Sequence, residues 1–196
     1  AITENLMCSL SSMGQLIRPC VVVVVKQICK PHDKTTRKDH TMNPVLIDHD
    51  RLAATLPEGF ESIPHDELET LIGARSEDMW GVRDRERHMM FIVTWKDSNK
   101  LLAKLMSEKG YATQMNNRFA TRCIKRSADM SDYRCGGFFA RDVTGATAQA
   151  QGFRFSYTVQ AVEQGGEVLI FKHGVRCYAL MYYTRLDVAE QNRPVY

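Results

Sequence analysis

The chain has 196 residues, of which 44% are hydrophobic and 25% are charged. This composition is typical of one soluble globular domain with enough apolar residues for a core. The formal net charge of +3 lies entirely in residues 1–41, because residues 42–196 carry 20 Lys and Arg against 20 Asp and Glu. A charge-neutral body argues against a dedicated nucleic-acid binder, whose non-specific affinity comes from neutralising phosphates.

Residues 1–41 form a basic arm, which we expect to be poorly ordered and interpret as sequence ahead of a native start at Met42. A targeting arm is the functional alternative. The run Cys20–Val25 is strongly β-forming, but it is far shorter than the roughly 20 apolar residues of a membrane span. An exposed valine run favours aggregation unless it pairs with the edge of a sheet. Residues 42–196 then read as a single α+β domain.

The domain begins with a strand, a turn and a short helix. The sequence Leu56-Pro57-Glu58-Gly59-Phe60 predicts a strand end and turn, because Pro fixes φ and Gly supplies the bend. Pro64 suits the first position of the helix, and Gly73 suits its end. The early helix carries three acids that favour its positive N-terminus, and we prefer this interpretation to a carboxylate site: Asp66, Glu67 and Glu69. Its predicted apolar stripe comprises Leu68, Leu71 and Ile72.

Residues 79–82 and 88–95 are predicted to form two strands joined by the charged turn 83–87. In the second strand Phe91, Val93 and Trp95 alternate with Met90, Ile92 and Thr94. Both faces are therefore partly apolar. We expect this strand to lie centrally in the sheet and to be covered on both sides.

Two helices are predicted next. The first is capped by Asp97 or Ser98 and carries an apolar stripe (Leu101, Leu102, Leu105 and Met106) before Gly110 stops it. The second spans residues 112–128 and places Met115, Phe119 and Cys123 on one side.

The second helix also carries a cationic cluster, spaced so that its members share another side: Arg118, Arg122, Lys125 and Arg126. Such a cluster can bind phosphate or the acidic surface of a protein partner. A solvated helix face explains it without further assumptions.

The sequence Cys135-Gly136-Gly137 permits a catalytic interpretation, because a glycine turn could expose a thiolate and present N–H groups to an oxyanion. The fold would have to supply the base from four histidines: His49, His65, His88 and His173. We expect instead that the two glycines turn the chain from the basic helix into the sheet. We expect the body cysteines to be reduced, small hydrophobes that are buried or half-buried. No dinucleotide, P-loop, zinc-protease or paired-cysteine motif is present, so no cofactor or metal is predicted.

The last third of the chain predicts three consecutive antiparallel strands. Phe153, Phe155, Tyr157 and Val159 alternate with Arg154, Ser156, Thr158 and Gln160, which indicates one buried face. Residues 167–172 and 175–184 are separated by His173-Gly174, a pair that suits a two-residue hairpin turn. The fold class is therefore α+β, with helices packed on a mostly antiparallel β-sheet.

Three segments resemble the Mog1/PsbP-like superfamily, in particular small proteins of that type from gut Firmicutes. They are residues 56–60, the strand and helix around 95–106, and the closing strand 152–159 with its Lys172-His173-Gly174 hairpin. The resemblance covers about residues 45–190 and implies an α/β/α sandwich. It also implies a packed helix after the last strand, of which Val188–Gln191 gives only the start. Members of this superfamily share a binding surface and no common reaction.

From these observations we expect a non-enzymatic bacterial, cytoplasmic module that recognises a protein partner. The reason is that the strand and helix patterns indicate a complete fold, whereas no catalytic, cofactor or metal motif is present. Two alternatives stay open: a thiol-dependent enzyme that uses Cys135 with a histidine brought near by the fold, and a carrier of a small apolar ligand.

Overall fold

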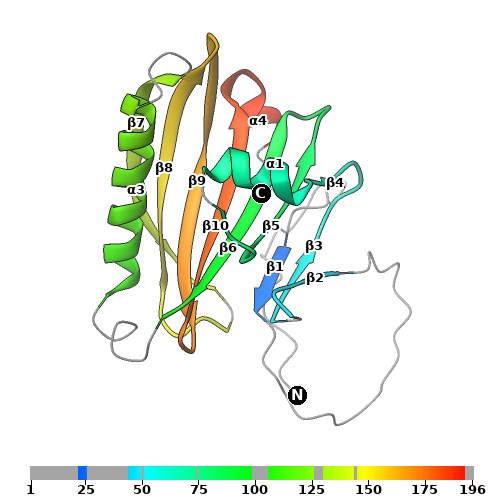
Figure 1. Ribbon diagram of the computed structural model, residues 1–196, viewed down its shortest axis with the longest axis vertical. Helices are drawn as coiled ribbons and strands as arrows, with labels where there is room; N and C mark the ends of the chain where they lie inside the picture. Colours follow the sequence, from blue (N-terminus) through cyan, green and yellow to red (C-terminus); the bar gives the residue numbers. More distant parts are fainter. Residues whose placement is uncertain are drawn as a thin grey trace, which may run out of the picture.

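The computed structural model describes residues 22–25, 44–49, 51–73, 75–98, 106–125, 130–143 and 145–192. Figure 1 shows two antiparallel sheets with helices beside them. The small sheet has the strand order β1 (Val22–Val25), β3 (Leu52–Thr55) and β2 (Val45–Ile47). The large sheet has the order β4 (Glu61–Ser62), β5 (Met79–Asp84), β6 (Met89–Asp97), β10 (Arg176–Arg185), β9 (Val162–His173), β8 (Ala150–Val159) and β7 (Met130–Arg141). The helices are α1 (His65–Ile72), α3 (Glu108–Lys125), α4 (Ala189–Asn192) and a single 3₁₀ turn, η1 (Leu186–Val188).

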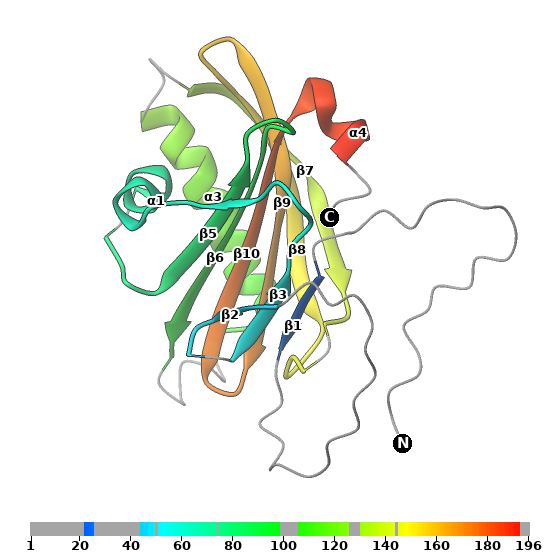
Figure 2. The same ribbon diagram turned by 90° about the vertical axis from the view of Figure 1, so that its right-hand side faces the viewer.

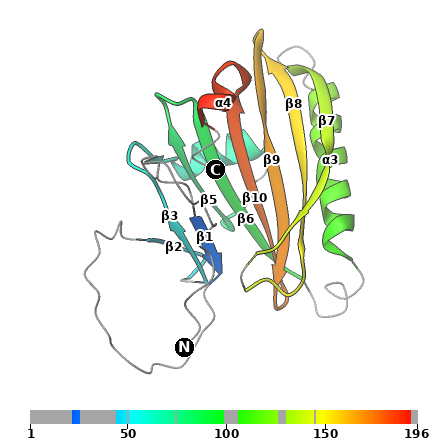
Figure 3. The same ribbon diagram turned by 180° about the vertical axis from the view of Figure 1, so that it is seen from behind.

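The two faces of the large sheet are covered by different layers. The helices α1 and α3 lie in front of the sheet in Figure 1, and the small sheet lies in front of it when seen from behind in Figure 3. Figure 2 shows the layers nearly edge-on. One core cluster joins Leu52 and Ala54 of the small sheet to Phe171 and Tyr178 of the large sheet. A second cluster lies under the helices, so each face of the sheet has its own core.

The strand β6 explains how both cores are built from one segment. Met89, Phe91 and Val93 belong to the core under the small sheet, whereas Ile92 belongs to the core under the helices. The strand lies between β5 and β10. The prediction of a central strand covered on both sides is therefore confirmed, and it follows from the alternation of two apolar faces.

The strands β8, β9 and β10 form the predicted antiparallel unit, with two differences in detail. The strand β9 begins at Val162 rather than near Glu167. His173 pairs with Arg176, so the hairpin turn consists of Gly174 and Val175 and not of His173 and Gly174. Gly174 has φ of +63°, which is the left-handed backbone that the turn requires.

Two predictions about helix signals are corrected. Gly110 does not stop a helix, because it lies in the first turn of α3, and residues 99–105 of the helix predicted before it lie outside the described residues. Leu71 is exposed at the surface of α1, so only Leu68 of the predicted stripe is fully buried. Gly73 does end α1 in a left-handed conformation, and Pro64 precedes its first turn. Gly81 of β5 lets α1 pack closely, since a Cβ there would come within 2.7 Å of Leu68 Cδ2.

The prediction that Gly136 and Gly137 turn the chain into the sheet is wrong. Both lie within β7, a strand at the edge of the large sheet. The pairing of β7 with β8 shifts register between Cys135 and Phe138, and Gly137 has φ of +106° there. The glycines therefore form a β-bulge, which bends an edge strand and interrupts its exposed ladder.

A buried polar cluster joins the small sheet to the large one. The carboxylate of Asp48, which follows β2, accepts a hydrogen bond of 2.6 Å from the Tyr178 hydroxyl and pairs with Arg176. Arg176 also donates to both carboxylate oxygens of Asp97, at 2.6 and 2.7 Å. These bonds with Asp97 and Asp48 raise the pKa of Arg176. Because Asp48 has a fully buried side chain, its charge is stable there only with these partners.

The predicted basic arm, residues 1–41, lies outside the described residues except for Val22–Val25. These four residues pair with β3 in antiparallel register. None of the helices that the structure describes is long and apolar enough to span a bilayer.

Candidate functional site

The helical face of the large sheet carries a cavity of about 580 Å³ between α1 and α3, which we call the groove. Its floor includes alternate residues of β10, which point to the same side of the sheet: Cys177, Ala179, Met181 and Tyr183. Six residue steps along a strand measure about 20 Å. The floor residues of β10 thus extend over about 20 Å, and Met79, Thr94 and Ile170 add the neighbouring strands β5, β6 and β9 to the lining.

The helix α3 forms one wall of the groove. Tyr111, Met115 and Phe119 recur at intervals of four residues and line the wall. Phe119 stacks against Tyr183 of the floor, with ring centroids 6.4 Å apart. The opposite wall comes from Met79 of β5 and from the end of α1. Apolar side chains from four separate segments therefore meet here.

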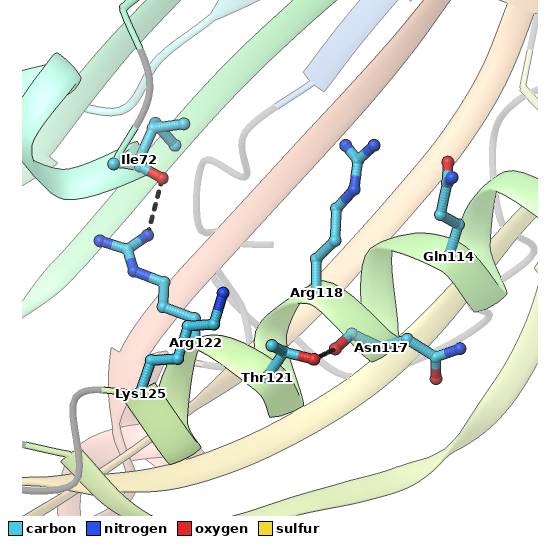
Figure 4. A pocket seen from close by; sticks show the side chains of 8 residues that line it. Ile72, Gln114, Asn117, Arg118, Thr121, Arg122 and Lys125 are labelled. Carbon is cyan, nitrogen blue, oxygen red and sulfur yellow. Dashed lines mark hydrogen bonds between the residues drawn. The ribbon is translucent and has the colours of Figure 1, made fainter.

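Arg122 ties the two helices together at the rim. Its Nη1 donates to the carbonyl of Ile72 at 2.8 Å (Figure 4). Its Nη2 donates to the carbonyl of Thr70 at 3.4 Å. Both carbonyls belong to the last turn of α1, where backbone acceptors lack helical partners. The guanidinium therefore caps α1, and part of its donor capacity is already used.

Arg118 lines the same rim one turn earlier, and its side chain extends away from α3 in Figure 4. Its side chain is exposed and forms no ion pair within the described ranges. Seven arginines elsewhere in the body are paired with carboxylates: Arg83, Arg85, Arg87, Arg141, Arg154, Arg176 and Arg185. Arg118 is thus a cation whose donors are available to a ligand.

Lys125 lies in the last turn of α3 and lines an outer cleft together with Arg118 and Arg122. The structure thus brings together three members of the predicted cationic cluster. The fourth, Arg126, lies outside the described residues. Next to Lys125, the side chain of Ile124 is 76% exposed. The sequence analysis did not single out Ile124, although an apolar residue on the polar side of α3 indicates an exposed apolar side chain.

The far end of the groove is closed by polar contacts. The hydroxyls of Ser98 and Tyr111 lie 3.2 Å apart, and Lys172 pairs with Glu108 at 3.8 Å. Burial raises the pKa of the Cys177 thiol to about 11, so this floor residue is protonated near neutral pH. The groove therefore presents a neutral floor along β10 and cations on its α3 side.

Cys135, the residue of the thiol-enzyme alternative, is exposed on β7 and does not behave as a buried hydrophobe. Within the described residues no histidine is hydrogen-bonded to it. His173 Nδ1 lies 2.7 Å from the Gly145 carbonyl, and His88 Nε2 lies 3.2 Å from Arg185. The three body cysteines are free thiols, and Cys123 is buried as predicted. No group of three His, Cys, Asp or Glu residues gathers as a metal site in the part of the chain that is described.

The architecture defines the class of fold: the chain has a PsbP-like α+β fold. The cyanobacterial PsbP (CyanoP) of Synechocystis sp. PCC 6803 superposes with a TM-score of 0.51 at 15% sequence identity, covering 94% of this chain and 91% of that one. The Saccharomyces cerevisiae Ran-binding protein Mog1p gives a TM-score of 0.44 at 8% identity, covering 79% of this chain and 85% of that one. No protein-family model matches the chain, and no curated protein sequence does either.

Proposed function

We propose that this chain is a non-enzymatic recognition module whose basic α3 surface binds an acidic protein partner. This surface consists of Arg118, Thr121, Ile124 and Lys125. The observation that carries the proposal is that Arg118 and Lys125 line one outer cleft and form no ion pair within the described residues. Seven arginines elsewhere in the body are instead neutralised by carboxylates. Arg126 is proposed as a fourth cation of this surface.

The composition of the surface supports protein recognition. Arginine is enriched in protein interfaces, and its donors pair with carboxylates in a fixed geometry. The side chain of Ile124 is largely exposed to water, so a partner that covers it removes apolar surface from water, which favours binding. Cations beside an exposed apolar residue therefore suit a partner with acidic groups around an apolar spot.

Capture from a native lysate with the immobilised full chain tests this function. The double variant Arg118→Glu with Lys125→Glu should abolish saturable capture, because it places like charges against an acidic partner. Lys109→Glu is the matched control, since Lys109 is exposed on the opposite side of the same helix. A partner that the double variant retains, or a chain that captures nothing saturably, would sink the proposal.

The ligand-carrier alternative is favoured by one specific observation, the groove of about 580 Å³ between α1, α3 and the sheet. Small-molecule sites in proteins have cavities of roughly 300 to 1,000 Å³ with mainly apolar walls and a few polar groups. We therefore propose ligand binding as a second function. Native mass spectrometry of the purified chain tests it: a bound small molecule that organic extraction removes is the supporting result.

A further inference from the structure

The walls of the groove are suited to a flexible apolar chain. Three methionines contribute to them from separate elements: Met79, Met115 and Met181. Methionine side chains are unbranched and polarizable, so they adapt to the shape of an apolar ligand. Phe119 and Tyr183 add a stacked aromatic pair above the floor. The lining thus offers continuous dispersion contact along the groove.

The floor of the groove is long enough for a linear ligand. Its floor follows β10 for about 20 Å from Cys177 to Tyr183. The wall of α3 runs beside this floor for about 16 Å from Tyr111 to Arg122, at 1.5 Å per residue. A floor of this length accommodates an extended long acyl chain.

Charge is distributed unevenly around the groove. On the side of β5 and β6 it is lined by Asp78, Lys96 and Asp97, and Asp97 is held by Arg176. Arg118 lies on the α3 side without an ion pair in the described residues. Arg122 neutralises the carbonyls at the end of α1, so the negative end of that helix does not repel an anion beside it. An anionic head group is therefore favoured at Arg118, because Lys96 shares the other side of the groove with two carboxylates.

We infer that the groove binds a long-chain carboxylate, with its apolar chain along the β10 floor and its head group on the Arg118 guanidinium. This inference rests on the carrier function proposed above and shares Arg118 with the proposed protein-binding surface, so a ligand head group and a protein partner would compete for that guanidinium. A guanidinium fork matches a carboxylate with two parallel hydrogen bonds. The head group remains at the rim in contact with water, so the ligand requires no buried charge.

The test is displacement of dansyl-labelled undecanoic acid from the purified full chain, followed by fluorescence below the micellar range. Three competitors separate the contributions of chain and head group. Palmitate carries both. Hexadecanol has the same chain length with a neutral head, and butyrate has the charged head with almost no chain. We expect palmitate to displace the probe, hexadecanol to compete about tenfold more weakly, and butyrate to have no effect.

Two variants locate the ligand. Arg118→Gln should weaken palmitate about tenfold and leave hexadecanol unchanged, because it removes only the charged hydrogen bonds. Lys109→Gln, on the opposite side of α3, should change neither ligand. Met115→Trp adds a bulky ring to the wall and should abolish binding of both ligands, with circular dichroism used to confirm that the variant is folded.

The inference is overturned if palmitate fails to displace the probe, or if palmitate and hexadecanol bind alike and Arg118→Gln affects neither. It is also overturned if folded Met115→Trp binds palmitate normally, because the ligand would then lie elsewhere. The inference is overturned as well if the probe is displaced by an acidic apolar peptide and not by palmitate. The competitor series and Met115→Trp report on the groove alone, because Met115 does not belong to the outer surface of α3, so the two functions fail separately.

Discussion

The buried carboxylate of Asp48 should contribute more to stability than the exposed carboxylate of Asp97, although both bind the same arginine. Asp48→Asn keeps the size of the side chain and tolerates the left-handed backbone at this position, where φ is +53°. The substitution removes the charge that pairs with Arg176 inside the protein and disturbs the 2.6 Å bond from Tyr178. Hydrogen bonds to charged groups contribute roughly 1.5 to 3 kcal/mol, so we expect a loss of about 2 kcal/mol.

For a chain of this length, 1 kcal/mol shifts the midpoint of thermal unfolding by roughly 2 to 4 °C. Asp48→Asn should therefore lower the midpoint by about 4 to 8 °C, measured by circular dichroism of the full chain. Asp97→Asn is the matched control: its side chain is 60% exposed, and its two bonds to Arg176 are solvent-screened despite their good geometry. An equal or larger shift from Asp97→Asn would refute the argument that burial decides the contribution.

Three further predictions concern the rim and the thiols. Arg122→Gln should lower the free energy of unfolding by about 1 to 2 kcal/mol in urea titrations, because it uncaps α1, whereas Arg118→Gln should change it by less than about 0.5 kcal/mol. Burial raises the pKa of Cys177 from 9.0 to about 11, so the unfolded thiol ionises at lower pH than the folded one. The free energy of unfolding should be unaffected by this thiol below pH 9 and should fall between pH 9 and 11. The fall should be weaker in Cys177→Ala. An identical pH profile in both proteins would count against the burial of this thiol. In the folded chain Cys135 should react with iodoacetamide at the rate of an ordinary exposed thiol, while Cys177 stays unlabelled, as followed by peptide mass mapping. Selective labelling of Cys135 far above that rate near neutral pH would favour the thiol enzyme.

The sequence predicted the elements whose side chains alternate clearly, and it failed where backbone geometry or tertiary packing decides. The two apolar faces of β6 placed that strand at the centre of the sheet. The edge strand β7 was missed because its residues are mostly exposed and Gly136-Gly137 carries the usual signal of a turn. Gly110 was read as a helix end, whereas it lies in the first turn of α3.

The candidate site was predictable only in part. Helical spacing correctly grouped Arg118, Arg122 and Lys125, since spacing along one helix is a local property. Their different roles were not predictable, because the bonds between Arg122 and α1 join residues 50 positions apart. The groove was equally hidden, because its walls come from segments that only the complete fold brings together.

The most direct test of recognition through α3 is site-specific photo-crosslinking in the cells that produce the chain. A photoreactive amino acid at Ile124 samples the proposed surface, and one at Leu46, which is 45% exposed on β2 in the opposite layer, serves as the control. The account predicts one reproducible crosslinked partner from Ile124, lost when Arg118 and Lys125 are reversed in charge, and none from Leu46. A partner crosslinked from Leu46 and not from Ile124 would contradict it.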